Sequence, residues 1–294
     1  MPARILYVGQ SVNITCNNGA SRYLPVQSFT NDVTRPIENI LSFGQLSALN
    51  RVQTNVSTTK TEIKSYLPYS SGTGLVSDPS RVNYVDAEFI AQLTGESLQG
   101  LVSTVTVSPN GFTMSGIFTD LAIDIAMGGF AMADFTFQGV GEPYYAPVPT
   151  GSAYTTQSNM PATFSPVISS HVSGEITTGC ANSFKFSLNI PTDTISCLGG
   201  DITGNQVQVA PSFVMVAKPP FKTSISVEGT AVGVPSVGGG QSQFIVGLLG
   251  ITLPTAQISS YSQNNSVGAI GTTYNYTLED VSANFVDVNS PYPY

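Results

Sequence analysis

The expected fold rests on residues 101–143, which read LVSTVTVSPNGFTMSGIFTDLAIDIAMGGFAMADFTFQGVGEP. Short runs rich in Val, Ile, Phe and Thr alternate there with turn-forming residues such as Ser-Pro-Asn-Gly and Gly-Gly. A rhythm of roughly 8 to 12 residues per strand and turn is typical of all-β sandwiches and barrels. The stretch therefore predicts four successive strands, over LVSTVTV, FTMSGIF, TDLAIDIAMGG and FAMADFTFQGVGEP.

The C-terminal part of the chain continues this pattern from residue 182 onward, beginning with NSFKFSLNIP, and it has no repeat of solenoid period. The 294 residues are 41% hydrophobic, enough for a substantial core. We predict a mainly β fold over residues 1–294: an antiparallel β-sandwich or barrel with one flanking α-helix and a long loop or arm around residues 143–180. Two β lobes fit the same pattern.

The one predicted helix lies in residues 83–103, NYVDAEFIAQLTGESLQGLVS. Asp86 is a suitable N-cap, and Phe89, Ile90 and Leu93 recur at the three- and four-residue spacing of a helix face. Gly95 is expected to end this helix, and ESLQGLV to form a separate short turn. The helix is expected to cover an open end or face of the β structure.

Charge is distributed unevenly along the chain, whose formal net charge is −8. Residues 1–81 carry seven basic and four acidic residues, whereas residues 82–184 carry eight acidic residues and no Lys or Arg. A protein that binds DNA tightly clusters Lys and Arg against the phosphates. Residues 82–184 have no such cluster. Either the acidic surface simply keeps the protein soluble, or it faces a polyanion without holding it.

Familiar catalytic and cofactor patterns are absent from the sequence. His171 is the single histidine, the three cysteines allow one disulfide at most, and no CxxC pair or phosphate-binding glycine loop occurs. Asp120 and Asp124 share strand parity but stand roughly 13 Å apart along a strand, too far for a glycosidase pair. Asp134 is expected to approach them from the next strand. We therefore predict no enzyme, cofactor or metal site.

No membrane insertion is predicted either. The longest apolar run, FIVGLLGI, is far shorter than the about 20 residues of a membrane helix, and the first residues do not read as a signal peptide. The sequence is therefore expected to be that of a soluble protein.

A mixed-charge segment, residues 31–54, interrupts this charge-poor chain with NDVTRPIENILSFGQLSALNRVQT. By itself it fits a helix capped by Thr34 and begun by Pro36. The following strand, in NVSTTKTEIKSYLPYS, places Lys60, Glu62 and Lys64 on one side.

Residues 29–67, 201–232 and 251–280 together resemble bacteriophage tail tube (major tail) proteins. In the first segment, FTNDVTRPIENILSFGQLSALNRVQTNVSTTKTEIKSYL, a strand enters an Arg-Pro-acidic turn and a Phe-Gly, followed by Arg-Val-Gln and an alternating strand. The other two read DITGNQVQVAPSFVMVAKPPFKTSISVEGTAV and ITLPTAQISSYSQNNSVGAIGTTYNYTLED. The resemblance implies a β-sandwich with a flanking helix, assembled into stacked hexameric rings whose inner sheets form one hollow tube. It also changes the local expectation, to a strand that runs to Arg35 and Pro36 and is followed by an extended or short-turn connection between subunits.

The same resemblance implies roles and partners. Partners would be further copies of the chain, the tape-measure protein, a possible tail sheath, terminator and baseplate proteins, and double-stranded DNA in transit. The protein would be assembled in the host cytoplasm and reside in the virion tail. Expected inter-subunit contacts are Arg35, Glu38, Arg51, Lys60, Glu62 and Lys64, and expected lumen-facing acids are Asp120, Asp124 and Asp134. Alternatives are a capsid decoration or other virion β-protein, a secreted carbohydrate-active β-sandwich enzyme, and a surface adhesin or pilin.

Overall fold

The chain is built mainly of β-strands with a single helix among the residues that the structure describes. The computed structural model describes residues 11–24, 26–40, 50–53, 56–66, 87–108, 111–126, 129, 132–145, 171–172, 178–203, 206–218, 220–231, 240–246, 249–264, 273–281 and 283–287. The mainly β prediction and the prediction of one helix are thus confirmed. Most of the loop predicted at 143–180 lies outside the described residues.

The elements follow one another along the chain in this order: β1 (Ser11–Thr15), β2 (Ser21–Leu24), β3 (Val26–Thr34), β4 (Ile37–Ile40), β5 (Asn50–Gln53), β6 (Thr58–Tyr66), α1 (Ala87–Leu98), β7 (Ser103–Ser108), β8 (Phe112–Ala126), β9 (Met132–Val140), β10 (Tyr144–Tyr145), β11 (His171–Val172), β12 (Thr178–Asn189), β13 (Thr192–Thr203), β14 (Gln206–Ala217), β15 (Lys222–Ala231), β16 (Gly240–Val246), β17 (Leu249–Asn264), β18 (Thr273–Asp280) and β19 (Asn284–Asp287).

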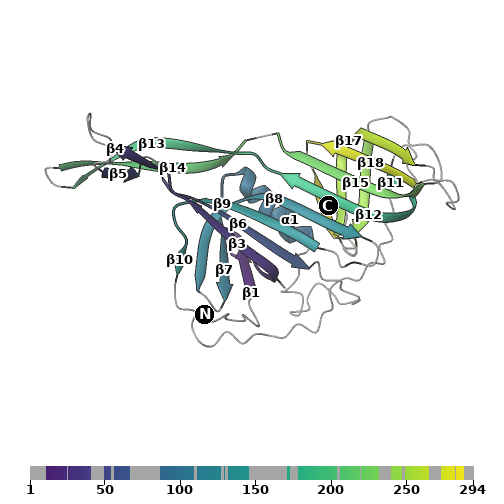
Figure 1. The fold of residues 1–294 in the computed structure, drawn as a ribbon, viewed down its shortest axis with the longest axis horizontal. Coiled ribbons are helices and arrows are strands. Elements are labelled where there is room, and N and C mark those ends of the chain that lie inside the picture. The colour runs from purple at the N-terminus through teal and green to yellow at the C-terminus, as the bar shows by residue number, and fades with distance from the viewer. Residues whose placement is uncertain are drawn as a thin grey trace.

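One wide antiparallel sheet dominates the molecule, and we call it the central sheet. Its strands lie in the order β3-β6-β9-β8-β12-β15-β18-β17, each hydrogen-bonded to the next. Figure 1 shows it running from β3 to β17 across the molecule. The sheet is open and does not close into a barrel, so within a single chain the barrel form of the prediction is not seen.

Two smaller sheets branch from the long strands β8 and β17. The first residues of β8 pair with β7 and β10, and β7 continues to β1 and β2. The first residues of β17 pair with β16 and β19, and β16 continues to β11. Each long strand therefore starts in a small sheet and ends in the central sheet.

Strand β8 is continuous over 15 residues, so the predicted break between FTMSGIF and TDLAIDIAMGG was wrong. No turn-forming pair separates those two runs. Instead the pairing with β9 shifts between Phe118 and Asp120, a β-bulge that leaves Thr119 as an extra residue. Because the bulge adds one residue, it reverses which side chains face inward: Phe118 is buried before it and Leu121 after it.

The core lies against one face of the central sheet. Neighbouring side chains on that face are apolar and almost completely buried. They include Ile63, Phe118, Leu121, Ile123, Phe135, Phe137, Phe184, Phe186, Leu188, Ile225 and Val227. Helix α1 adds Phe89, Ile90 and Leu93, and it contacts β8, β14 and β19. This confirms that the helix covers a face of the β structure, as Figure 1 also shows.

Helix α1 does not end at Gly95 as predicted but runs on to Leu98. Its end is a Schellman motif, in which the Gly100 amide donates to the Ser97 carbonyl and the Leu101 amide to the Glu96 carbonyl. Gly100 has a φ of 71°, the left-handed conformation that the motif needs. The Glu96 carboxylate also accepts the backbone amides of residues 17 and 18 at 2.7 and 3.2 Å, and this tertiary anchor stabilises the last turn.

Two hairpins extend from the central sheet. β4 and β5 pair only with each other among the described residues, and so do β13 and β14. The β13–β14 ribbon reaches well beyond the body of the molecule (Figure 1). β3 ends at Thr34, just before the predicted end at Arg35 and Pro36. Residues 37–40 then form a strand that pairs with β5, and not the first turn of the alternative helix.

Candidate functional site: the polar face of the central sheet

The face of the central sheet opposite the core is polar, because buried and exposed side chains alternate along its strands, apart from the bulges. In β6, Thr59, Thr61, Ile63 and Ser65 are buried while Thr58, Lys60, Glu62 and Lys64 are exposed. In β12, Phe184, Phe186 and Leu188 are buried while Lys185, Ser187 and Asn189 are exposed. The strand register carries this alternation across the whole sheet, and we call the exposed side the polar face.

The three acidic residues predicted to line a lumen lie together in the middle of the polar face. The register places Asp134 of β9 opposite Ala122 of β8, between Asp120 and Asp124 on that strand. The approach of Asp134 from the next strand is thus confirmed. The structure brings the three carboxylates to one solvent-facing surface, which is the arrangement that a lining would need.

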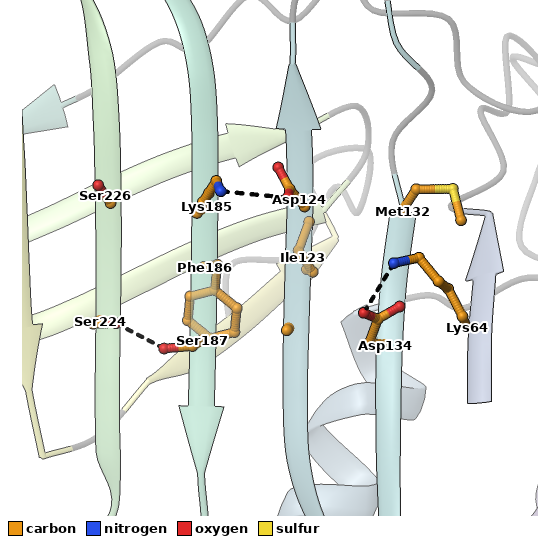
Figure 2. A pocket seen from close by; sticks show the side chains of 11 residues that line it. Lys64, Ile123, Asp124, Met132, Asp134, Lys185, Phe186, Ser187, Ser224 and Ser226 are labelled. Carbon is orange, nitrogen blue, oxygen red and sulfur yellow. Dashed lines mark hydrogen bonds and ion pairs between the residues drawn. The ribbon is translucent and has the colours of Figure 1, made fainter. Parts of the chain in front are cut away.

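Each of these carboxylates has a partner from a neighbouring strand, as Figure 2 shows for two of them. Lys64 Nζ lies 3.4 Å from Asp134 Oδ2, and Lys185 Nζ lies 3.6 Å from Asp124 Oδ2. Asn189 Nδ2 donates to Asp120 Oδ1. Each of the three carboxylates is therefore bound by a polar side chain of a neighbouring strand.

Lys60 is surrounded by acidic groups near the β3 edge. Its ammonium lies 2.5 Å from Glu62 Oε1, and Asp32 of β3 stands directly opposite it in the register. The hydrogen bond to Glu62 raises the pKa of Lys60 above its usual value, and the charges of Asp120 and Asp32 add to this effect. Lys60 therefore keeps its positive charge across the neutral range.

Serines fill the polar face on the other side of β8. The hydroxyls of Ser187 and Ser224 lie 2.7 Å apart on neighbouring strands. With Ser226, Lys185 and Asp134 they line a shallow hollow of about 350 Å³ (Figure 2). Such a wide, hydroxyl-rich surface offers hydrogen bonds without concentrating positive charge.

The polar face is only moderately acidic. Among the described residues it carries seven carboxylates, Asp32, Glu62, Asp120, Asp124, Asp134, Glu228 and Glu279, and four lysines, Lys60, Lys64, Lys185 and Lys222. This leaves three uncompensated negative charges. The base-free stretch of the sequence thus meets lysines from strands outside it, which the linear charge pattern does not reveal.

The remaining predicted contact residues lie away from this face. Arg35 follows β3 and its Nε lies 2.6 Å from Glu142 Oε1 of the same chain, with both side chains about half exposed. Glu38 is exposed on β4, and Arg51 stands opposite Asn39 in the β4–β5 hairpin. The structure therefore does not group Arg35, Glu38 and Arg51 with Lys60, Glu62 and Lys64.

Sequence reasoning missed the contribution of β12 to the polar face. Lys185, Ser187 and Asn189 occupy the solvent-facing positions that pair with Asp124, Ala122 and Asp120. The signal was present in SFKFSLN, where polar residues alternate strictly with Phe and Leu. The strand partner itself was not readable, because β8 and β12 are far apart in the sequence.

No protein-family model matches the chain, and no curated protein matches it. Within the described ranges, no group of three or more His, Cys, Asp or Glu side chains is placed to hold a metal ion. Nor does the described part of the chain contain a helix that is long and apolar enough to cross a membrane. His171 lies on β11 opposite Gln243.

Proposed function

We propose that the chain is a structural protein that assembles into stacked rings and forms a phage tail tube, with the polar face of the central sheet lining the bore. The observation that carries this proposal is the central sheet itself. One face packs on the core, while the other is a broad polar surface with a small excess of negative charge. Such a surface repels phosphates weakly, so DNA slides along it without being captured.

The projecting hairpins support assembly. A two-stranded hairpin is marginally stable by itself in water, yet β13 and β14 pair over twelve residues each away from the body. Such a ribbon gains stability when a second surface covers it. We infer that it contacts the neighbouring ring.

Electron microscopy of the purified chain tests the proposal directly. Negative-stain images at high protein concentration should show rings or hollow tubes. A strictly monomeric chain at every concentration would overturn the proposal. Particles that bind capsids but enclose no bore would favour the capsid decoration alternative.

The lining role has its own test in assembled tubes. The double substitution Glu228→Lys and Glu279→Lys leaves five carboxylates and six lysines on the polar face, so its net charge becomes positive. We expect these tubes to retain DNA in a salt-dependent manner, because each lysine facing a phosphate releases counterions. The matched Glu228→Gln and Glu279→Gln tubes should not. Equal retention by both variants would contradict a lining role.

Arg35 tests the predicted inter-subunit contacts. If Arg35 acts between chains, Arg35→Glu stops assembly and the added substitution Glu142→Arg does not rescue it. If the ion pair within the chain is what matters, the double swap restores assembly. Circular dichroism of each variant checks that the monomer remains folded.

A further inference from the structure

The chain contains two units whose strands are connected alike, except that β2 and α1 of the first unit have no counterpart among the described residues. The first unit covers the described residues from 11 to 145 and the second those from 171 to 287. Equivalent elements, in chain order, are β1 and β11, β3 and β12, the hairpins β4–β5 and β13–β14, β6 and β15, β7 and β16, β8 and β17, β9 and β18, and β10 and β19. The central strands pair in the order β3-β6-β9-β8 in the first unit and β12-β15-β18-β17 in the second. The start of the long strand pairs with β7 in the first unit and with β16 in the second.

The registers of the two units share two irregularities, although the second unit has further shifts at Gly179 and between Gly240 and Ser242. The β3–β6 pairing skips Gln27 and the β12–β15 pairing skips Asn182. The β8–β9 pairing skips Thr119 and the β17–β18 pairing skips Ser259. Two β-bulges at equivalent positions are conformational details that independent folds would not share by chance.

A side-chain hydrogen bond is repeated at the second of these bulges. Thr119 Oγ1 lies 3.3 Å from the Thr136 carbonyl oxygen, and Ser259 Oγ lies 3.3 Å from the Thr277 carbonyl oxygen. The Thr119 hydroxyl also lies 2.8 Å from Asp120 Oδ2. The register makes Thr119 equivalent to Ser259 and Thr136 equivalent to Thr277. In both units, therefore, a hydroxyl residue occupies the bulge and lies close to the equivalent carbonyl.

A weak sequence repeat accompanies the structural one. Ser28, Phe29 and Pro36 in QSFTNDVTRP correspond to Ser183, Phe184 and Pro191 in NSFKFSLNIP, with the same spacing. Phe29 and Phe184 both point toward the core side, and the proline in each case follows the strand and precedes a hairpin. The chain is thus a tandem pair of equivalent β units.

The two units join along one strand pair. The last part of β8 in the first unit is antiparallel to β12, the first central strand of the second unit. Leu121 and Leu188 meet there on the core side, and each is only 1% exposed. On the polar face the Asp124–Lys185 ion pair spans the junction.

β3 and β17, the strands equivalent to β12 and β8, lie at the two ends of the central sheet. Among the described residues, neither end has a strand beside it like the one at the junction. No described strand pairs with β3 on the side away from β6, or with residues 257–264 of β17 on the side away from β18. Val33 and Tyr261 are equivalent to Leu188 and Leu121, yet they are 37% and 41% exposed. Large apolar side chains at the core-side positions of both edges indicate surfaces that another strand covers.

We propose that copies of this chain join edge to edge, with β17 of one copy against β3 of the next in the register of the β8–β12 junction, and that three chains therefore supply the six units of one ring. The edge pairing follows from the repeat, while the count of three rests on the proposed tube function with six units per ring. Tyr261 then meets Val33 of the next copy, and Ser262 meets its Asp32.

The size of the resulting ring suits a conduit. Three chains place 24 strands side by side, and at about 4.8 Å per strand they enclose a circle of roughly 37 Å backbone diameter before strand tilt widens it. Barrels of about 16 to 18 strands already hold an aqueous channel. A polymer can therefore pass through the ring.

Cysteine cross-linking tests the pairing and the count together. In a chain whose three native cysteines are replaced by serine, Asp32→Cys and Ser262→Cys should form a disulfide between copies on oxidation. The equivalent internal pair, Ala122→Cys and Ser187→Cys, should form a disulfide within one chain and serves as the positive control. Asp32→Cys with Tyr261→Cys, whose side chains lie on opposite faces, should cross-link several-fold less.

The covalent products on a non-reducing gel distinguish the outcomes. A closed ring of three gives dimers and trimers and nothing larger, whereas a ladder to six overturns the count of three but leaves the tube proposal intact. Tubes in which only the internal pair cross-links overturn the edge pairing. Covalent trimers that never stack support the inference and overturn the tube function. A monomer with no cross-link between copies overturns both.

A second pair of variants separates assembly from folding. Val33→Lys should abolish cross-linking and rings while the monomer keeps its circular dichroism and melting profile. Leu188→Lys, at the equivalent but buried position, should unfold the chain. Normal assembly of the Val33→Lys chain would overturn the edge pairing.

Discussion

The β8–β12 junction inside the chain and the open edges of β17 and β3 are formed by equivalent strands. They differ in whether another strand covers them. At the junction, Leu121 and Leu188 are buried against each other's strand. At the edges, the equivalent Tyr261 and Val33 keep more than a third of their surface exposed. In a tandem repeat, the covered junction serves as a template for the uncovered edges, and it is the basis for the proposed pairing with another copy.

The largest expected effect concerns the aromatic core of the first unit. Phe118→Ala should lower the free energy of unfolding by about 3 to 5 kcal/mol, because it empties a fully buried site. The equivalent Ile258 is only partly buried, so Ile258→Ala should cost less than about 2 kcal/mol. Urea unfolding followed by circular dichroism measures both. Equal losses would show that the two units are packed alike.

A smaller effect is expected at Gly139, where β9 passes close to β8. A Cβ atom there would lie 2.4 Å from the Ser115 carbonyl oxygen, so Gly139→Ala should destabilise the fold by about 1 to 3 kcal/mol. The second unit has Asp280 at this position, and its carboxylate accepts the Thr255 amide and hydroxyl at 2.7 and 2.8 Å.

Two further variants complete this comparison of Gly139 with Asp280. Asp280→Ala should cost about 1 to 3 kcal/mol through its lost hydrogen bonds rather than through a clash. Gly95→Ala, on α1 with nothing within 4 Å, should be neutral or stabilise the chain by up to about 1 kcal/mol. A harmless Gly139→Ala in thermal melts would contradict the close approach of the two strands.

The ion pair at the junction should matter less. Both side chains of Asp124 and Lys185 are more than half exposed, so Lys185→Ala should cost under about 1 kcal/mol, and less at high salt. The equivalent edge positions are Asn264 and Thr30. Thr30→Lys with Asn264→Asp should therefore lower the concentration at which rings form, measured by sedimentation. Thr30→Lys alone should not, and a failure of the double variant would weaken the proposed register.

The smallest effect is expected from the titration of Lys60. Because its pKa is raised in the folded chain, its stabilising contribution is complete below the ordinary lysine value of 10.5 and is lost as the pH rises through the raised value. Thermal melts between pH 9 and about 12 should therefore fall more steeply for the natural chain than for Lys60→Met. Identical profiles would show that Glu62 does not hold the ammonium.

The sequence predicted the elements whose signals are local. The alternation in TTKTEIKSY identified both faces of β6, and the spacing of Phe89, Ile90 and Leu93 identified the helix. Gly95 misled the prediction of the helix end, because the anchor that stabilises the last turn, Glu96, bonds to residues nearly eighty positions away.

The repeat and half of the polar face could not be predicted in the same way. Few residue identities link the units, and Ser-Phe followed by Pro is too short a pattern to be distinguished from chance. What the units share is register and bulge position, which depend on strand pairs far apart in the chain. Asp120, Asp124 and Asp134 were found because they lie on neighbouring strands, whereas Lys185 required the β8–β12 pairing.

The unequal hairpins have a consequence for symmetry. The strands of β4–β5 are four residues long and those of β13–β14 twelve, although the two hairpins occupy equivalent places in the repeat. A ring of three chains would present long and short projections in alternation around its rim. Successive rings would then fit in three orientations about 120° apart instead of six, so stacking would fix the rotational phase of the whole tube.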